Sequence, residues 1–171
     1  MTDINLALHD VAASSHRGVA FLLAFGVCWL LCGVAASWLT PRRAALVVMC
    51  QGMVGLPLAF GLQRWLGFPP ADPSNPLTPL AIYMATSQLV ALPAVFFIYR
   101  YMPTHVPAVF ASVLGAHFLP YVWLQQSRVY LALSITVSVG SWVVMALFRE
   151  RGYRAVPMFV GVALLIAAAA L

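Results

Sequence analysis

The stretch Gly18–Arg43, GVAFLLAFGVCWLLCGVAASWLTPRR, decides the fold, because a long apolar run ends there at two adjacent arginines. The run 18–39 carries no charged residue, and its length meets the roughly 20 apolar residues that a helix needs to cross a bilayer. Thr40 and Pro41 begin a short polar turn of the kind that lies among phospholipid headgroups. This stretch therefore predicts a transmembrane helix in contact with membrane lipids.

The same pattern recurs to the end of the chain. The segment 67–78, GFPPADPSNPLT, interrupts it with four prolines and predicts a non-helical loop. We therefore predict an all-α fold, a polytopic membrane helix bundle of about six transmembrane helices that forms a single domain over residues 1–171. The predicted spans are 18–39, 44–66, 79–99, 106–123, 129–148 and 155–171.

The first 17 residues predict a short amphipathic helix that lies on the membrane surface. Ile4, Leu8 and Val11 fall near one face of a helix, whereas Asp3 and Asp10 fall elsewhere. The two aspartates and the length of the following apolar run are not those of a secretory signal sequence.

Composition excludes a soluble fold. Hydrophobic residues make up 63% of the chain and charged residues 8%, which is more apolar surface than one soluble core of this size can hide. The net charge of +5 comes from arginine alone, since the chain has no lysine. The arginines lie at the ends of apolar runs and form no basic stripe with interleaved aromatic residues, so we predict no nucleic-acid partner.

The arginines also predict an orientation. Positively charged residues are retained on the cytoplasmic side of a membrane. Three arginines lie on the side of the amino terminus and six on the opposite side, so we predict that both termini are on the outer side. The smaller set is Arg17, Arg64 and Arg128, and the larger set is Arg42, Arg43, Arg100, Arg149, Arg151 and Arg154.

No motif for catalysis or metal binding is present in the predicted spans. The acidic residues all lie outside them, so the membrane interior has no carboxylate for proton transfer or ion coupling. Cys28 and Cys32 share a helix face, but two soft ligands without a third indicate no metal site. We predict no cofactor and no catalytic residue. The acidic residues are Asp3, Asp10, Asp72 and Glu150.

A layer of uncharged polar side chains is the candidate binding site. At a helical rise of about 1.5 Å per residue, its deeper members fall within roughly 7 Å of the bilayer centre. His117 is the one ionisable group at that depth, and Tyr121 follows it at helical spacing. The predicted binding residues are Tyr83, Ser87, Gln88, His117, Tyr121, Ser134 and Ser138.

This layer has two interpretations. Its hydroxyl and amide groups can join helices to one another through hydrogen bonds worth about 0.6 kcal/mol each. Alternatively, they line a pocket for a small solute or lipid, with His117 as the central group because an unpaired imidazole in the membrane is costly. Gln51 and Ser141 fit the first interpretation better than the second.

Two segments resemble a known family. GAHFLPYVWLQQSRVY at Gly115–Tyr130 and NPLTPL at Asn75–Leu80, with Ser87, Gln88 and Pro93 downstream, resemble a family of small bacterial multi-helix membrane proteins of unknown function. The resemblance covers the middle and second half of the chain. It implies a protein of the bacterial cytoplasmic (inner) membrane and brings no activity with it.

Three functions remain open at this point. The favoured one is a homo-oligomeric protein that binds or transports a small solute or lipid. The second is an intramembrane lipid-modifying enzyme with His117 as base and Tyr121 or Ser134 as donor, which we rank lower because no carboxylate or metal would stabilise developing charge. The third is a structural or regulatory subunit whose loop at 149–154 docks a cytoplasmic partner.

Overall fold

The structure is a computed structural model that describes residues 4–70 and 72–171. It confirms the all-α fold, and the described residues contain no strand. Asp3, which we predicted to lie away from the apolar face of the amino-terminal helix, is outside the described residues. The elements are α1 (Ile4–Ser14), η1 (His16–Gly18), α2 (Val19–Ala36), α3 (Pro41–Cys50), α4 (Gly52–Trp65), α5 (Thr78–Ser87), η2 (Gln88–Ala91), α6 (Leu92–Tyr101), η3 (Pro103–His105), α7 (Val106–Leu124), α8 (Val129–Phe148), η4 (Arg149–Arg151) and α9 (Gly152–Ala169), where η denotes a 3₁₀ helix.

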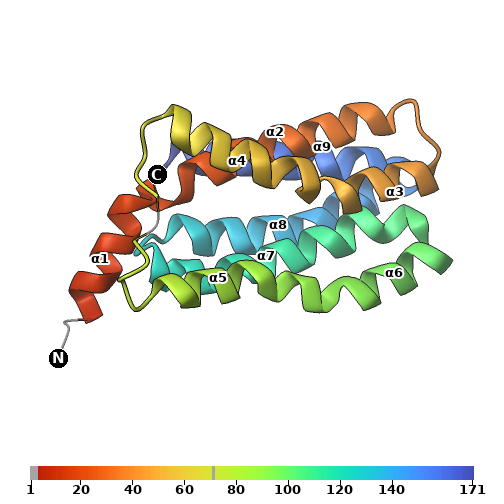
Figure 1. The fold of residues 1–171 in the computed structure, drawn as a ribbon. Helices are drawn as coiled ribbons and strands as arrows, with labels where there is room; N and C mark the ends of the chain where they lie inside the picture. The colour runs from red at the N-terminus through yellow and green to blue at the C-terminus, as the bar shows by residue number, and fades with distance from the viewer. Residues whose placement is uncertain (1–3, 71) are drawn as a thin grey trace.

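Five helical runs among the described residues are long and apolar enough to cross a membrane. The last run, Val129–Ala169, is 41 residues long and comprises α8 and α9, which pack against each other. At Arg149 the backbone leaves the helical region, with φ 46° and ψ −115°, and the run reverses direction. The chain therefore forms a bundle of parallel and antiparallel rods, with both termini near one end (Figure 1).

Two of the rods are broken near their middle, which the sequence analysis did not predict. The second rod is divided at Gln51 into α3 and α4. The third is divided by η2, just before Pro93. Because proline has no N–H, the Leu89 carbonyl loses its usual helical donor, and the Leu92 N–H bonds to that carbonyl instead. The proline thus accounts for the 3₁₀ segment between α5 and α6.

The closest helix packing is between α2 and α9. Gly26 and Gly161 face each other there, and a Cβ added at Gly161 would lie 2.8 Å from the Gly26 carbonyl oxygen. Further along the pair, a Cβ at Gly33 would meet Met158. Small residues let helix backbones approach closely in a membrane, so these glycines account for the close contact of α2 with α9.

Helix α1 lies obliquely across one end of the rods (Figure 1). Leu8 is 3% exposed and packs with Leu77 and Leu124. The side-chain amide of Asn75 donates a hydrogen bond of 2.9 Å to the Ala7 carbonyl. The loop that leads into α5 is therefore attached to α1.

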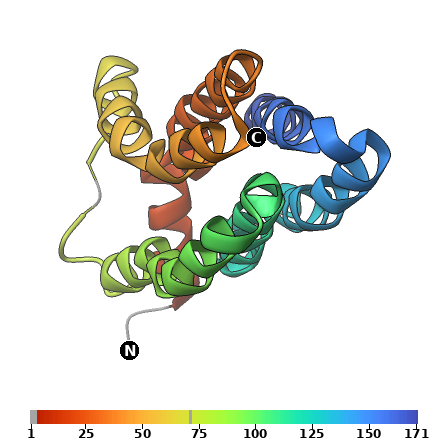
Figure 2. The same cartoon turned by 90° about the vertical axis from the view of Figure 1, so that its right-hand side faces the viewer.

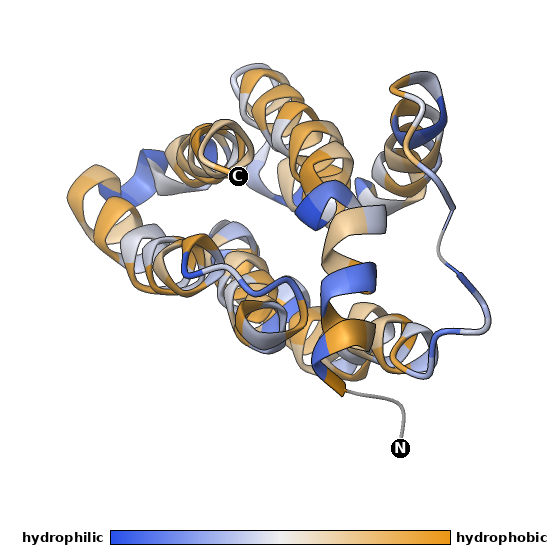
Figure 3. Cartoon of the chain, turned by 90° about the vertical axis from the view of Figure 1, so that its left-hand side faces the viewer, coloured by the Kyte–Doolittle hydropathy of each residue, from blue (hydrophilic) through white to orange (hydrophobic). Residues whose placement is uncertain are grey.

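The rod α5–η2–α6 is the least covered part of the bundle. Val95 is its one buried residue, and Val90 is 83% exposed. End-on, α5 lies on the side opposite α9 (Figure 2). Hydrophobic residues run along the rods, and the hydrophilic stretches lie mainly in α1 and the connections (Figure 3). An apolar surface of this extent suits contact with lipid.

Candidate functional site

His117 and Tyr121 are the predicted site residues that the structure brings into contact. They lie one turn apart on α7, with ring centroids 5.1 Å apart in an edge-on arrangement. Nδ1 of His117 is buried and has no hydrogen-bond partner. A buried polar atom in this state retains the full cost of leaving water, about 1–3 kcal/mol.

The same two side chains join α7 to α5. The Tyr121 hydroxyl donates to the Ala81 carbonyl at 3.5 Å, a long bond by ordinary criteria. On α5, a backbone group of Met84 lies within hydrogen-bonding reach of the His117 ring. The contact between these helices is therefore partly polar and rests on few groups.

The predicted residues of the third rod do not join this group. Tyr83 is 69% exposed. The Ser87 hydroxyl is exposed and donates to the Met84 carbonyl of its own helix at 2.7 Å. Gln88 is partly buried at the start of η2.

Ser134 and Ser138 lie where α7 and α8 are in closest contact. Ser134 is 4% exposed. A Cβ added at Gly115 would overlap the Ser138 hydroxyl and lie 2.8 Å from the Ser134 carbonyl oxygen. This geometry is that of helix packing, in which small residues permit a close approach.

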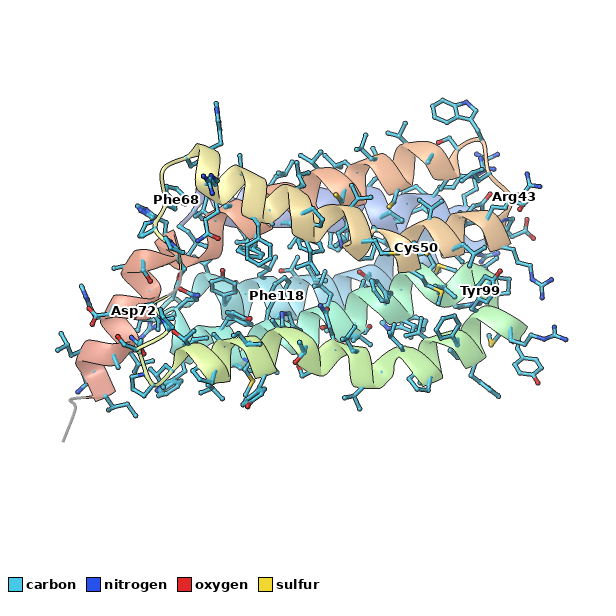
Figure 4. The ribbon with its side chains drawn as sticks, viewed as in Figure 1. Arg43, Cys50, Phe68, Asp72, Tyr99 and Phe118 are labelled. Carbon is cyan, nitrogen blue, oxygen red and sulfur yellow. The ribbon has the colours of Figure 1, made fainter. Side chains whose placement is uncertain are left out.

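An aromatic group beside His117 was not predicted. Tyr130 is 2% exposed, and its ring lies 5.7 Å from that of Tyr121 and 5.9 Å from that of Phe118. Figure 4 shows Phe118 within the length of the rods, nearer to the Asp72 end than to the Tyr99 end. The Tyr130 hydroxyl donates to the Arg17 carbonyl, so the group is linked to the start of α2. Helical spacing in a sequence identifies neighbours on one helix only. It could not predict the contact between Tyr121 on α7 and Tyr130 on α8.

The hydrogen bond from Tyr130 to Arg17 lies at an unusual stretch of backbone. His16, Arg17 and Gly18 are three successive residues with positive φ, at 44°, 52° and 77°. Such a conformation costs a residue other than glycine about 1 kcal/mol or more. The His16 ring also stacks on Phe68, with centroids 3.8 Å apart. The junction between α1 and α2 is thus fixed by two contacts from distant segments.

A large cavity of about 1010 Å³ opens at the opposite end of the bundle. It lies between the turn from α8 to α9, the turn from α6 to α7 and the start of α3. The arginines of this region predicted the orientation of the chain, but their spacing did not predict a cavity. Its lining residues are Pro41, Thr104, His105, Trp142, Met145, Ala146, Arg149, Glu150, Arg151, Tyr153 and Arg154.

Comparison with known proteins identifies a family. A model of the family of unknown function DUF7010 matches residues 4–171. The chain belongs to this family. No curated protein and no solved structure matches the DUF7010 chain. The match covers nearly the whole chain, whereas the predicted resemblance covered its middle and second half.

Family membership assigns no activity to the DUF7010 chain, and the fold makes it a multi-pass membrane protein of unknown function. In residues 4–70 and 72–171, no three His, Cys, Asp or Glu side chains lie together as metal ligands would. Two features therefore remain as candidate sites: the His117 group within the bundle and the cavity at its end.

Proposed function

We propose that this protein binds a neutral small solute or lipid at the His117 group, between α5 and α7. The observation that carries the proposal is the buried Nδ1 of His117, which lacks a hydrogen-bond partner. A neutral imidazole has one donor and one acceptor nitrogen. A ligand with a hydroxyl or carbonyl group would supply the missing bond and remove the cost of the unpaired atom.

His117 differs from two of the three other residues whose buried polar atoms lack partners in the part of the chain that the structure describes. Trp29 and Ser141 have no exposed surface, and so a ligand cannot reach them without parting the core. His117 adjoins α5, which belongs to the least covered rod. Starting from Val106, it lies roughly 16 Å along α7 at the helical rise of 1.5 Å per residue, which is near the middle of a bilayer core.

The rod α5–η2–α6 provides a route of entry. The 3₁₀ segment at Gln88–Ala91 divides it, and Tyr121 and His117 provide its polar contacts with α7. Outward movement of α5 would expose the His117 group to the lipid phase. The proposed ligand is neutral because no charged side chain lies at this depth of the rods.

We also propose an orientation of the bundle in the membrane. Six arginines lie at the end with the α8–α9 turn and three at the end with the termini. Figure 4 places Arg43 at the first end and Asp72 at the second. By the retention of positive charge in the cytoplasm, the six-arginine end faces the cytoplasm of a bacterium, and both termini face outward.

Photo-crosslinking tests the proposal. The protein is placed in phosphatidylcholine nanodiscs that contain a diacylglycerol with a diazirine group, and labelled peptides are mapped by mass spectrometry. We expect labels on α5 and α7 in the wild type. His117→Phe, which keeps a ring but removes both nitrogens, should reduce this labelling about tenfold, the equivalent of one lost hydrogen bond in a site without water.

His9→Ala is the matched control, because His9 is exposed on α1 and its loss should leave labelling unchanged. A second arm measures glycerol uptake by stopped-flow light scattering of proteoliposomes, to detect a neutral solute in place of a lipid. Equal labelling and equal uptake in the wild type and His117→Phe would refute the proposal.

A further inference from the structure

The cavity at the six-arginine end has the composition of an anion site. Three of its lining residues are Arg149, Arg151 and Arg154, and Glu150 is its one carboxylate. Within residues 4–70 and 72–171, no arginine of this group forms an ion pair. Guanidinium groups bind phosphate through two parallel hydrogen bonds. Positive charge therefore exceeds negative charge in the cavity wall.

Arg154 is held in place by its neighbour Tyr153, and Arg149 has an unusual backbone conformation. Nε of Arg154 donates to the Tyr153 hydroxyl at 2.8 Å, and its Cζ lies 5.2 Å from the ring centroid. Tyr153 itself is 5% exposed. Arg149 occupies a strained backbone conformation, at φ 46° and ψ −115°. Strain of this kind costs about 1–3 kcal/mol and recurs at functional sites.

The backbone contributes helix ends of both polarities. Helices α3, α7 and α9 begin at this cavity, and α8 ends there, since Pro41, His105, Arg151 and Ala146 are among its lining residues. A helix amino terminus carries about half a positive charge and a carboxyl terminus about half a negative charge. The first N–H groups of α7 and α9 already donate to carbonyls of the preceding 3₁₀ turns, so the arginine side chains are the main source of positive charge.

The cavity also has an apolar side. Trp142 and Met145, both on α8, line it beside the arginines, and Trp142 is fixed by a 2.9 Å hydrogen bond from its Nε1 to Ser112. Its volume of about 1010 Å³ is at the upper limit of ordinary ligand pockets. It therefore has room for a phosphate ester with a small apolar part as well as for the phosphate group.

We propose that this cavity binds a phosphate or phosphate-ester group, with Arg149, Arg151 and Arg154 as its ligands. The group comes either from an anionic phospholipid of the adjacent leaflet or from a free phosphate compound. The site is separate from the His117 group and does not depend on the function proposed for it.

Two binding measurements on the full chain test the proposal. In phosphatidylcholine nanodiscs, inorganic phosphate is titrated against tryptophan fluorescence, with chloride at equal ionic strength as reference and Trp142→Phe to assign the signal. In nanodiscs with one fifth phosphatidylglycerol, native mass spectrometry counts the anionic lipids that the released protein retains.

We expect R149Q/R151Q to weaken binding of the phosphate group at least tenfold, since each charged hydrogen bond contributes about a factor of ten. R42Q/R43Q is the matched control: it removes the same charge at the same end, outside the cavity lining, and should change binding less than twofold. If R149Q/R151Q does not fold, R151Q alone replaces it, with a three- to tenfold loss expected.

The two arms identify the source of the group. Retention of phosphatidylglycerol without a response to phosphate indicates a lipid headgroup, and a response in both arms indicates recognition of phosphate itself. The proposal is overturned if the wild type binds neither probe, or if both double variants lose binding equally, because the arginines would then act only through the general charge of that membrane face.

Discussion

The pair α2–α9 and the rod α5–η2–α6 are both long apolar helices, yet they pack in opposite ways. In the pair, Gly26 and Gly161 let the backbones touch. The rod has no glycine between 78 and 101, and its contacts with α7 include the polar ones from His117 and Tyr121. In lipid, hydrophobicity places a helix in the membrane but does not choose its neighbours; small residues and polar groups do.

The largest effect should follow from Gly161→Ala. Its new Cβ would lie 2.7 Å from Cγ of Leu30 and 2.8 Å from the Gly26 carbonyl oxygen. Because one of these neighbours is backbone, the helices must separate, and overpacking of this kind costs about 1–3 kcal/mol. Thermal unfolding in detergent, or unfolding by a denaturing detergent, should show this loss.

Ala85→Leu is the corresponding change on the loose rod. Ala85 is exposed on α5, and surface substitutions usually change stability by less than about 0.5 kcal/mol. If Ala85→Leu destabilised the protein as much as Gly161→Ala, the rod would be as tightly packed as the pair, and the distinction between them would be wrong.

The sequence predicted the helical rods well and their interruptions poorly. Apolar runs that end at arginines, such as 18–39, are recognisable because a bilayer requires a fixed length of apolar helix. The break at Gln51 has no such marker, since it lies inside an apolar run six residues before Pro57. The roles of Gly26 and Gly161 depend on which helices become neighbours, and local pattern does not contain that information.

The same limit applies to the candidate sites. His117 and Tyr121 could be paired from the sequence because one helix carries both at a spacing of one turn. The placement of Ser138 against Gly115, and the exposure of Tyr83, depend on how α8 and α5 are rotated. The arginine-lined cavity needs three connections far apart in the chain to meet at one end, which only the fold can show.

A smaller effect is expected from Asn75→Ala, which removes an attachment of the loose rod. Asn75 is 8% exposed, donates to the Ala7 carbonyl and accepts from the Leu77 N–H at 2.9 Å. Its loss removes one hydrogen bond to α1 and leaves the buried Leu77 N–H without a partner, at a cost of about 1–2 kcal/mol. The loss should be local, so hydrogen exchange should accelerate in α1 and α5 and remain unchanged in α2 and α9. Uniform acceleration would show that the rod and the pair unfold as one unit.

The smallest effect concerns Asp72, in the loop that leads to α5. Its Oδ1 accepts hydrogen bonds from the Ser74 hydroxyl and the Ser74 N–H at 2.7 and 2.8 Å, and these bonds hold the pKa of the Asp72 carboxyl below its usual range. A carboxyl whose pKa is lowered in the folded state stabilises that state above its unfolded pKa of about 3.9, and the contribution is lost as the pH falls through the folded value.

Ser74→Ala removes the hydroxyl donor, so the Asp72 pKa measured by carboxyl NMR should rise toward the ordinary value. Because the side chain is fully in solvent, the melting temperature at neutral pH should stay unchanged, and a large drop would mean that this loop supports the rod more strongly than its exposure indicates.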